Sequence, residues 1–278
     1  MPLKLHLKNQ LHVPLNVDRV LPENASAKDF HSMRVDEGNH AGQLSDYFDM
    51  DGTAVEDQTL CFSGDLQNVY GIGAGMTCGT IEVQGNTGPF VGRRMSGGKI
   101  VVGGNTDDYL GAEMTGGQIV VRGDAGNYVG ANGPGGKYGM NRGTIFISGS
   151  AGQSLGRRMR RGTIVVQESV GPLCGWEMLA GTILVFGSTG DNAGLDMKRG
   201  SIILAGESTK SFRASTTFAE GTASHSQAIA MIGAWLKQSE IEIPKDTIDR
   251  SLLERKFVQW HGDLNEGGRG EIFAPVEC

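Results

Sequence analysis

The stretch VGRRMSGGKIVVGGNTDDYLGAEMTGGQIVVRGDAGNYVG, residues 91–130, contains one pattern twice. Met95 and Ile100 of the first copy are followed, 19 residues later, by Met114 and Ile119 of the second. The segment is also rich in glycine. These glycines either bind a ligand, as in a phosphate loop, or shape a scaffold.

The pattern continues through half of the chain. Methionine returns at gaps of 19 residues, with one gap of 26, at Met76, Met95, Met114, Met140, Met159, Met178 and Met197. Isoleucine follows each methionine after five residues, an aliphatic residue follows after two more, and a glycine after another two in every unit except the one with Glu168. Leu60, Phe62 and Gly64 fit as a partial first unit. Such a period is the signature of a repeat architecture.

The period also predicts the fold. An Ile-x-Val alternation bounded by glycines is typical of a short strand. One such strand cannot bury a face alone, whereas equivalent strands stacked about 4.8 Å apart share a continuous interior. Leucine-rich, hexapeptide and calcium-binding nonapeptide repeats have other periods or consensus residues. We therefore expect an all-β fold, a right-handed parallel β-helix of about seven 19-residue coils.

The flanking segments lack the repeat, and exposed solenoid ends need covering. We expect residues 1–58 to form an N-terminal cap with a small sheet and loops, and residues 59–206 to form the repeat domain, with an insertion near 131–139. Residues 207–278 would form a C-terminal cap, with helices at 224–238 and 244–260 and an extended tail.

Composition excludes several classes of protein. The net charge of −6 argues against nucleic acid or an anionic membrane as the partner. No apolar run has the length of a membrane span, and the N-terminus lacks the apolar block of a signal peptide. The four cysteines are scattered without a Cys-x-x-Cys pair, which is typical of reduced thiols. We predict a cytoplasmic protein.

The candidates for chemistry are weak. GIGAG at residues 71–75 lies on repeat positions and precedes a strand, unlike a dinucleotide loop. The six histidines lie outside the coils, and no pair has metal-ligand spacing. We therefore predict no catalytic residue and no metal site in this chain. One alternative stays open, a ligand-binding or catalytic pocket at the coil–cap junction lined by groups such as His225, Trp235 or His261.

Basic residues gather around two of the methionine positions. Stacking would place Arg94 beside Glu113 and Arg158 beside Glu177, as ion pairs worth about 0–1 kcal/mol each. Other arginines would be left unpaired and would instead contact an acidic partner subunit or the anionic tail of a substrate; these are Arg93, Arg157, Arg160 and Arg161. The candidate contact residues are Arg93, Arg94, Arg157, Arg158, Arg160 and Arg161, with Lys137 and Tyr138 in the insertion.

The units GAGMTCGTIEVQG, VGRRMSGGKIVVGGNT and LGAEMTGGQIVVRGDAG resemble the Gly-x-Gly-x-Gly repeat domain over about residues 58–206. That domain occurs at the C-terminus of the glutamate synthase large subunit. It also forms the C subunit of formylmethanofuran dehydrogenase and of its bacterial relative, the formyltransferase/hydrolase complex of methylotrophs. A separate chain of 278 residues with its own flanks is most similar to the C subunit, and its composition favours the bacterial complex.

This resemblance implies a non-catalytic structural subunit in one-carbon metabolism. The complex would transfer a formyl group between tetrahydromethanopterin and a methanofuran analogue and hydrolyse it to formate. The implied partners are a formyltransferase, a metal-dependent hydrolase and a dehydrogenase-like subunit, which would hold the metal and the cofactors. Two alternatives stay open: a C subunit of a molybdenum or tungsten formylmethanofuran dehydrogenase, and a free-standing glutamate synthase-like β-helix domain.

Overall fold

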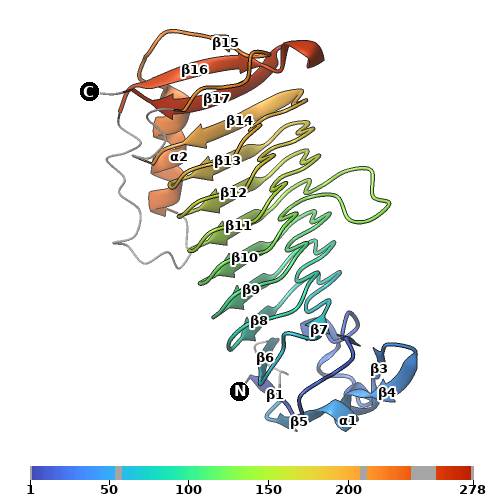
Figure 1. Cartoon of the computed structure of the whole chain (residues 1–278). Helices are drawn as coiled ribbons and strands as arrows, with labels where there is room; N and C mark the ends of the chain where they lie inside the picture. Colours follow the sequence, from blue (N-terminus) through green and yellow to red (C-terminus); the bar gives the residue numbers. More distant parts are fainter. Residues whose placement is uncertain (1, 54–57, 207–211, 239–254, 277–278) are drawn as a thin grey trace.

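The computed structural model describes residues 2–53, 58–206, 212–238 and 255–276. Figure 1 shows an elongated stack of similar coils, with the N-terminal segments at one end and strands β15–β17 at the other. One large sheet runs along the whole stack. It has 13 strands in the order β15-β16-β17-β14-β13-β12-β11-β10-β9-β8-β6-β1-β5.

Each repeat unit contributes one short strand to this sheet. These strands are β8 (Thr80–Val83), β9 (Lys99–Val102), β10 (Gln118–Val121), β11 (Thr144–Ile147), β12 (Thr163–Val166), β13 (Thr182–Val185) and β14 (Arg199–Leu204). Neighbours pair in parallel and in the register of the repeat, so that Ile100 lies opposite Ile119 and Ile119 opposite Ile145. A second line of parallel bridges links Thr87, Thr106, Ala125, Ala151, Val170 and Thr189 from coil to coil. The chain is therefore mostly β, with one large and mostly parallel sheet, which is consistent with the expected β-helix-like fold.

Two apolar clusters lie on the two faces of the sheet. The interior holds the methionine and isoleucine ladders, whose members are fully buried at positions such as Met114 and Ile119. The middle residues of the strands point to the other face, where Val120, Phe146, Val165, Leu184 and Ile203 form the second cluster. Helix α2 (Gln227–Gln238) covers this face through Ile229 and Leu236 (Figure 1). The predicted helix at 224–238 is thus confirmed over most of its length.

The N-terminal segment adds strands at one end of the stack. β1 (Leu3–Leu7) pairs in parallel with β6 (Thr59–Ser63) and antiparallel with β5 (Phe48–Asp51). A separate four-stranded sheet consists of β4 (His40–Gln43), β3 (Arg34–Glu37), β2 (Leu15–Asn16) and β7 (Val69–Tyr70). Short helical turns η1 (Pro22–Asn24), η2 (Phe30–Ser32) and α1 (Leu44–Tyr47) connect these strands. The division of the chain into three domains stays a prediction.

The C-terminal segment differs from the expectation. The predicted helix at 244–260 is wrong at its end, because β16 (Phe257–Gly262) is a strand, while residues 244–254 lie outside the described residues. β16 pairs antiparallel with β17 (Arg269–Pro275), which continues the sheet in parallel beyond β14. Buried Phe257 and Trp260 stabilise the strand against the core. The described part of the expected extended tail contains β17, which lies within the sheet.

The remaining elements are small. β15 (Ala219–Glu220) pairs antiparallel with β16, and the turn η5 (Leu264–Glu266) joins β16 to β17. In the described part of the chain, every helix is too short or too polar to cross a bilayer.

Candidate functional site

Two clusters of ion pairs lie where successive coils meet. Arg94 Nε lies 2.6 Å from Glu113 Oε2, and Arg158 Nε lies 2.9 Å from Glu177 Oε2. The predicted pairs are therefore confirmed. The prediction that Arg93 has no acidic neighbour is wrong, because Arg93 Nη2 lies 3.4 Å from the same oxygen of Glu113.

The second cluster repeats this arrangement. Arg157, which we also expected to be unpaired, has its Nε 3.2 Å from Glu177 Oε2. In each cluster the corner of one coil presents two consecutive arginines to a single carboxylate of the next coil. The physical reason is the turn, in which Arg94 and Arg158 adopt left-handed backbone conformations with φ of 58° and 54°. Each cluster therefore carries one positive charge in excess.

The shared carboxylate of the second cluster stays ionised to low pH. The hydrogen bond from Arg158 is the largest cause that holds the pKa of Glu177 below its ordinary value, against the opposing effect of partial burial. The same hydrogen bond raises the pKa of the Arg158 guanidinium. Charged hydrogen bonds of this kind favour the ionised form of both partners. The cluster therefore remains charged throughout the physiological range of pH.

Aromatic rings lie against the arginines and against one another. The guanidinium of Arg157 lies 4.0 Å from the centre of the Trp176 ring, and that of Arg93 lies 5.3 Å from the centre of the Phe90 ring. Phe90 begins a stack with Tyr109 and then Tyr128, in which successive ring centres are 4.9 Å apart. Sequence reasoning missed this stack, although its three members are spaced by the same 19 residues.

The insertion projects from one corner of the stack between β10 and β11 (Figure 1). It contacts the first arginine cluster. Its Gly136 lies directly against the Glu113 carboxylate, so that a Cβ atom there would collide with Oε1. At its other end, the Gly139 N–H donates to the carbonyl of Arg158 at 2.9 Å. The insertion is therefore anchored to both arginine clusters.

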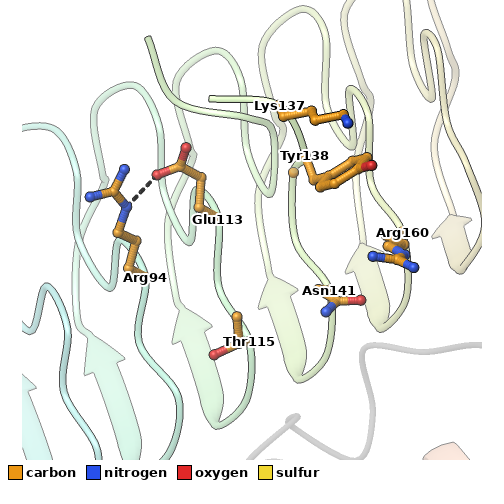
Figure 2. Close-up of a pocket in the computed structure, with 8 residues that line it drawn as sticks. Arg94, Glu113, Thr115, Lys137, Tyr138, Asn141 and Arg160 are labelled. Carbon is orange, nitrogen blue, oxygen red and sulfur yellow. Dashed lines mark hydrogen bonds and ion pairs between the residues drawn. The ribbon is translucent and has the colours of Figure 1, made fainter. Parts of the chain in front are cut away.

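Tyr138 separates two hollows on this surface. The first has a volume of about 410 Å³ and is lined by Arg94, Glu113, Thr115, Lys137, Tyr138, Gly139, Asn141 and Arg160 (Figure 2). The second, of about 430 Å³, is lined by Lys137, Tyr138, Arg158, Glu177, Leu179, Asp196, Lys198 and Glu266. Tyr138 is 39% exposed. Lys137 Nζ lies 5.2 Å and the Arg160 guanidinium 5.3 Å from the centre of its ring.

The structure thus brings most of the candidate contact residues to one surface. Arg161 is exposed and follows Arg160 directly in the chain. The groups suggested for a pocket at the coil–cap junction, His225, Trp235 and His261, are all exposed. Among the residues that the structure describes, no group of three or more His, Cys, Asp or Glu side chains could hold a metal ion.

The family described as the GXGXG motif matches residues 80–220, which is half of the chain. The chain therefore belongs to the GXGXG family, a class of repeat proteins. It is similar to the C subunit of the molybdenum-containing formylmethanofuran dehydrogenase 1 of Methanothermobacter marburgensis, with 36% identity over 84 residues. The C subunit of the tungsten-containing formylmethanofuran dehydrogenase 2 of Methanothermobacter wolfeii is 36% identical over 91 residues.

These two alignments cover 29% and 31% of this chain and only 21% and 34% of the relatives. A solved structure extends the similarity to nearly the whole chain. It is that of the formyltransferase/hydrolase complex (FhcABCD) from Methylorubrum extorquens, determined with methylofuran. One of its chains is similar with a TM-score of 0.87 and 28% identity, over 99% of this chain and 100% of that chain.

Proposed function

We propose that this protein is a non-catalytic structural subunit of a formyltransferase/hydrolase complex in one-carbon metabolism. The observation that carries the proposal is the similarity, over 99% of this chain, to an entire chain of such a complex. A stack of strands in a common register is rigid, because each strand is held by its neighbours on both sides. Such a body suits a subunit that holds larger partners at fixed positions.

In this proposal the chemistry belongs to the partners. They would transfer a formyl group between tetrahydromethanopterin and a methanofuran analogue and hydrolyse it to formate. A formyltransferase, a metal-dependent hydrolase and a dehydrogenase-like subunit would bind the metal and these cofactors. The cytoplasm remains the predicted location.

The finer architecture is part of the same proposal. Seven methionine positions support about seven coils, and the general preference of parallel crossovers supports right-handed winding. The residues that flank the coils would cap the two ends of the stack, because open sheet edges pair with other chains. We also propose the candidate basic residues as partner contacts. Their support is the excess positive charge of each arginine cluster, on a chain whose net charge is −6.

Purification of the native chain under mild conditions, followed by mass analysis of the proteins that copurify, tests this function. We expect a formyltransferase and a metal-dependent hydrolase of the amidohydrolase type. We also expect the isolated chain to have no formyl-transfer or hydrolase activity, and activity to appear only in the complex. Turnover by the isolated chain, or its recovery without larger subunits, would contradict the proposal.

The second candidate is the C subunit of a molybdenum or tungsten formylmethanofuran dehydrogenase. The relatives with 36% identity favour it, since they are subunits of enzymes named for these metals. The same purification distinguishes the two. A copurifying metal–pterin subunit, with molybdenum or tungsten in the elemental analysis, would identify the complex as the dehydrogenase and not the hydrolase complex.

A further inference from the structure

The first hollow beside Tyr138 has a basic lining, although the chain is acidic overall. Arg94, Lys137 and Arg160 contribute three positive charges to its lining, and Glu113 contributes the single negative charge. The chain as a whole has a net charge of −6. The second hollow, across Tyr138, has three basic and three acidic residues in its lining. Of these two hollows, the first has an excess of positive charge and the second has none.

The one carboxylate of this hollow is already engaged. Glu113 binds both Arg93 and Arg94, and its side chain is only 12% exposed. In the described part of the chain, Lys137 and Arg160 contact the face of the Tyr138 ring and have no acidic partner. A cation over an exposed ring gains less than a cation bound to a carboxylate. Both groups therefore remain available to an anion.

Asn141 adds a buried polar atom that lacks a hydrogen-bond partner. Its side-chain Oδ1 is buried and has no hydrogen-bond partner. It belongs to the lining of the same hollow, between Thr115 and Arg160 (Figure 2). A buried amide left without a partner costs about 1–3 kcal/mol. A peptide group of a bound segment forms a hydrogen bond with this amide in either orientation of the Asn141 side chain, because it offers both an N–H and a C=O.

We propose that this hollow binds an acidic peptide segment of a partner subunit. A carboxylate of that segment lies between Lys137 and Arg160, and one of its peptide groups pairs with Asn141. The inference rests on the proposed function, since it assumes a partner subunit, and it adds the chemistry of that partner. The volume of about 410 Å³ lies within the range of ligand sites, roughly 300–1,000 Å³.

The surroundings favour an acidic peptide over a nucleic acid. A phosphate backbone is bound by an extended basic surface, whereas this chain carries a net negative charge and the basic lining of this hollow is small. The insertion also fixes the position of Lys137, because its backbone is anchored next to both arginine clusters. Two cations at fixed positions favour a ligand whose carboxylate lies between them.

Fluorescence anisotropy with the full chain and a labelled oligoglutamate peptide tests the proposal. We expect the double variant Lys137→Glu/Arg160→Glu to weaken the affinity tenfold or more, and Lys137→Gln/Arg160→Gln to weaken it less. The matched control is Arg19→Glu/Lys28→Glu, which makes the same change of net charge at two exposed positions in the N-terminal segment. It should leave the affinity within twofold, and circular dichroism checks that every variant is folded.

Several results would overturn the inference. These are no binding of oligoglutamate, equal binding of oligoglutamine, equal losses in the Lys137/Arg160 variant and its control, or equally effective competition by inorganic phosphate or single-stranded DNA. The two proposals fail separately. If the native chain copurifies with its partners but does not bind oligoglutamate at this hollow, the structural role stands and the acidic-segment site is wrong.

Discussion

Two glycines in the turn before a repeat methionine, two coils apart, test why glycine recurs in this repeat. Gly75 and Gly111 both have positive φ, +76° and +59°. A Cβ atom at Gly75 would meet nothing within 4 Å. At Gly111 it would lie 2.5 Å from Cδ1 of Ile145 and 3.3 Å from Cδ1 of Ile119, two members of the buried isoleucine ladder.

The magnitudes follow from these distances. An alanine at positive φ costs about 1–2 kcal/mol at either position. At Gly111 the methyl group must also displace the end of Ile145, which is fully buried between neighbouring strands. Forcing an extra methyl into a packed core costs about 1–3 kcal/mol. We therefore expect Gly75→Ala to lower the free energy of unfolding by about 1–2 kcal/mol, and Gly111→Ala by about 2–5 kcal/mol.

Urea unfolding of the full chain, followed by far-ultraviolet circular dichroism, measures this difference. The midpoint gives the stability change, provided that the slope of the free energy with urea is the same in both variants. A change of slope would show that the coils no longer unfold together, and the comparison would then use hydrogen exchange of the strands next to each site.

Equal losses of stability in the two variants would refute this reasoning. The glycines would then be required for their backbone conformation and not for space. The chain itself argues against that result. The position of Gly75 is occupied in the next two coils by Arg94 and Glu113, which adopt φ of 58° although they carry long side chains.

Three further predictions concern the site and the core. Glu177→Gln should lower the free energy of unfolding by about 1 kcal/mol at neutral pH, because two half-exposed arginines lose their carboxylate. The pKa of Glu177 is lowered in the folded protein, so its contribution is present above the unfolded value of 4.5 and is lost as pH falls through the folded pKa. Urea titrations over this pH range should show the variant and the parent converging, and a constant difference would contradict the assignment. Tyr109→Leu should lower the free energy of unfolding by about 0.5–1.5 kcal/mol more than the loss of buried apolar area alone, because it interrupts the stacked rings. Thermal unfolding measures this difference, with Tyr109→Phe as the control that should retain the stack. Burial raises the pKa of the Cys174 thiol to about 12, so iodoacetamide should modify exposed Cys78 in the native protein and reach Cys174 only in denaturant, as followed by peptide mass mapping.

Part of the candidate site could be predicted from spacing. A residue 19 positions after another lies above it in the next coil, and this rule correctly joined Arg94 to Glu113 and Arg158 to Glu177. The same rule failed for Arg93, because it pairs each residue only with the residue 19 positions later. The left-handed turn at Arg94 instead lets two adjacent side chains reach one carboxylate.

Other features depended on segments that are distant in sequence. The insertion folds back so that Gly136 contacts Glu113, and Tyr138 of the insertion meets Arg160. The local sequence pattern does not predict the direction in which a loop leaves a coil. The same is true of residues 257–260, whose aromatic and aliphatic side chains suit a helix or a strand. Pairing with β17 makes them a strand.

The sequence by itself determined the strands, their register and the buried ladders, because only stacking at a 19-residue interval places every methionine and isoleucine against its equivalent. The tertiary structure alone decided which face helix α2 covers, how the arginines share their carboxylates, and where the hollow beside Tyr138 lies. The physical reason is that equivalent residues are buried in every coil, so that the burial pattern recurs at a fixed interval in the sequence. A surface site arises once, from side chains and loops that meet only after the coils have stacked.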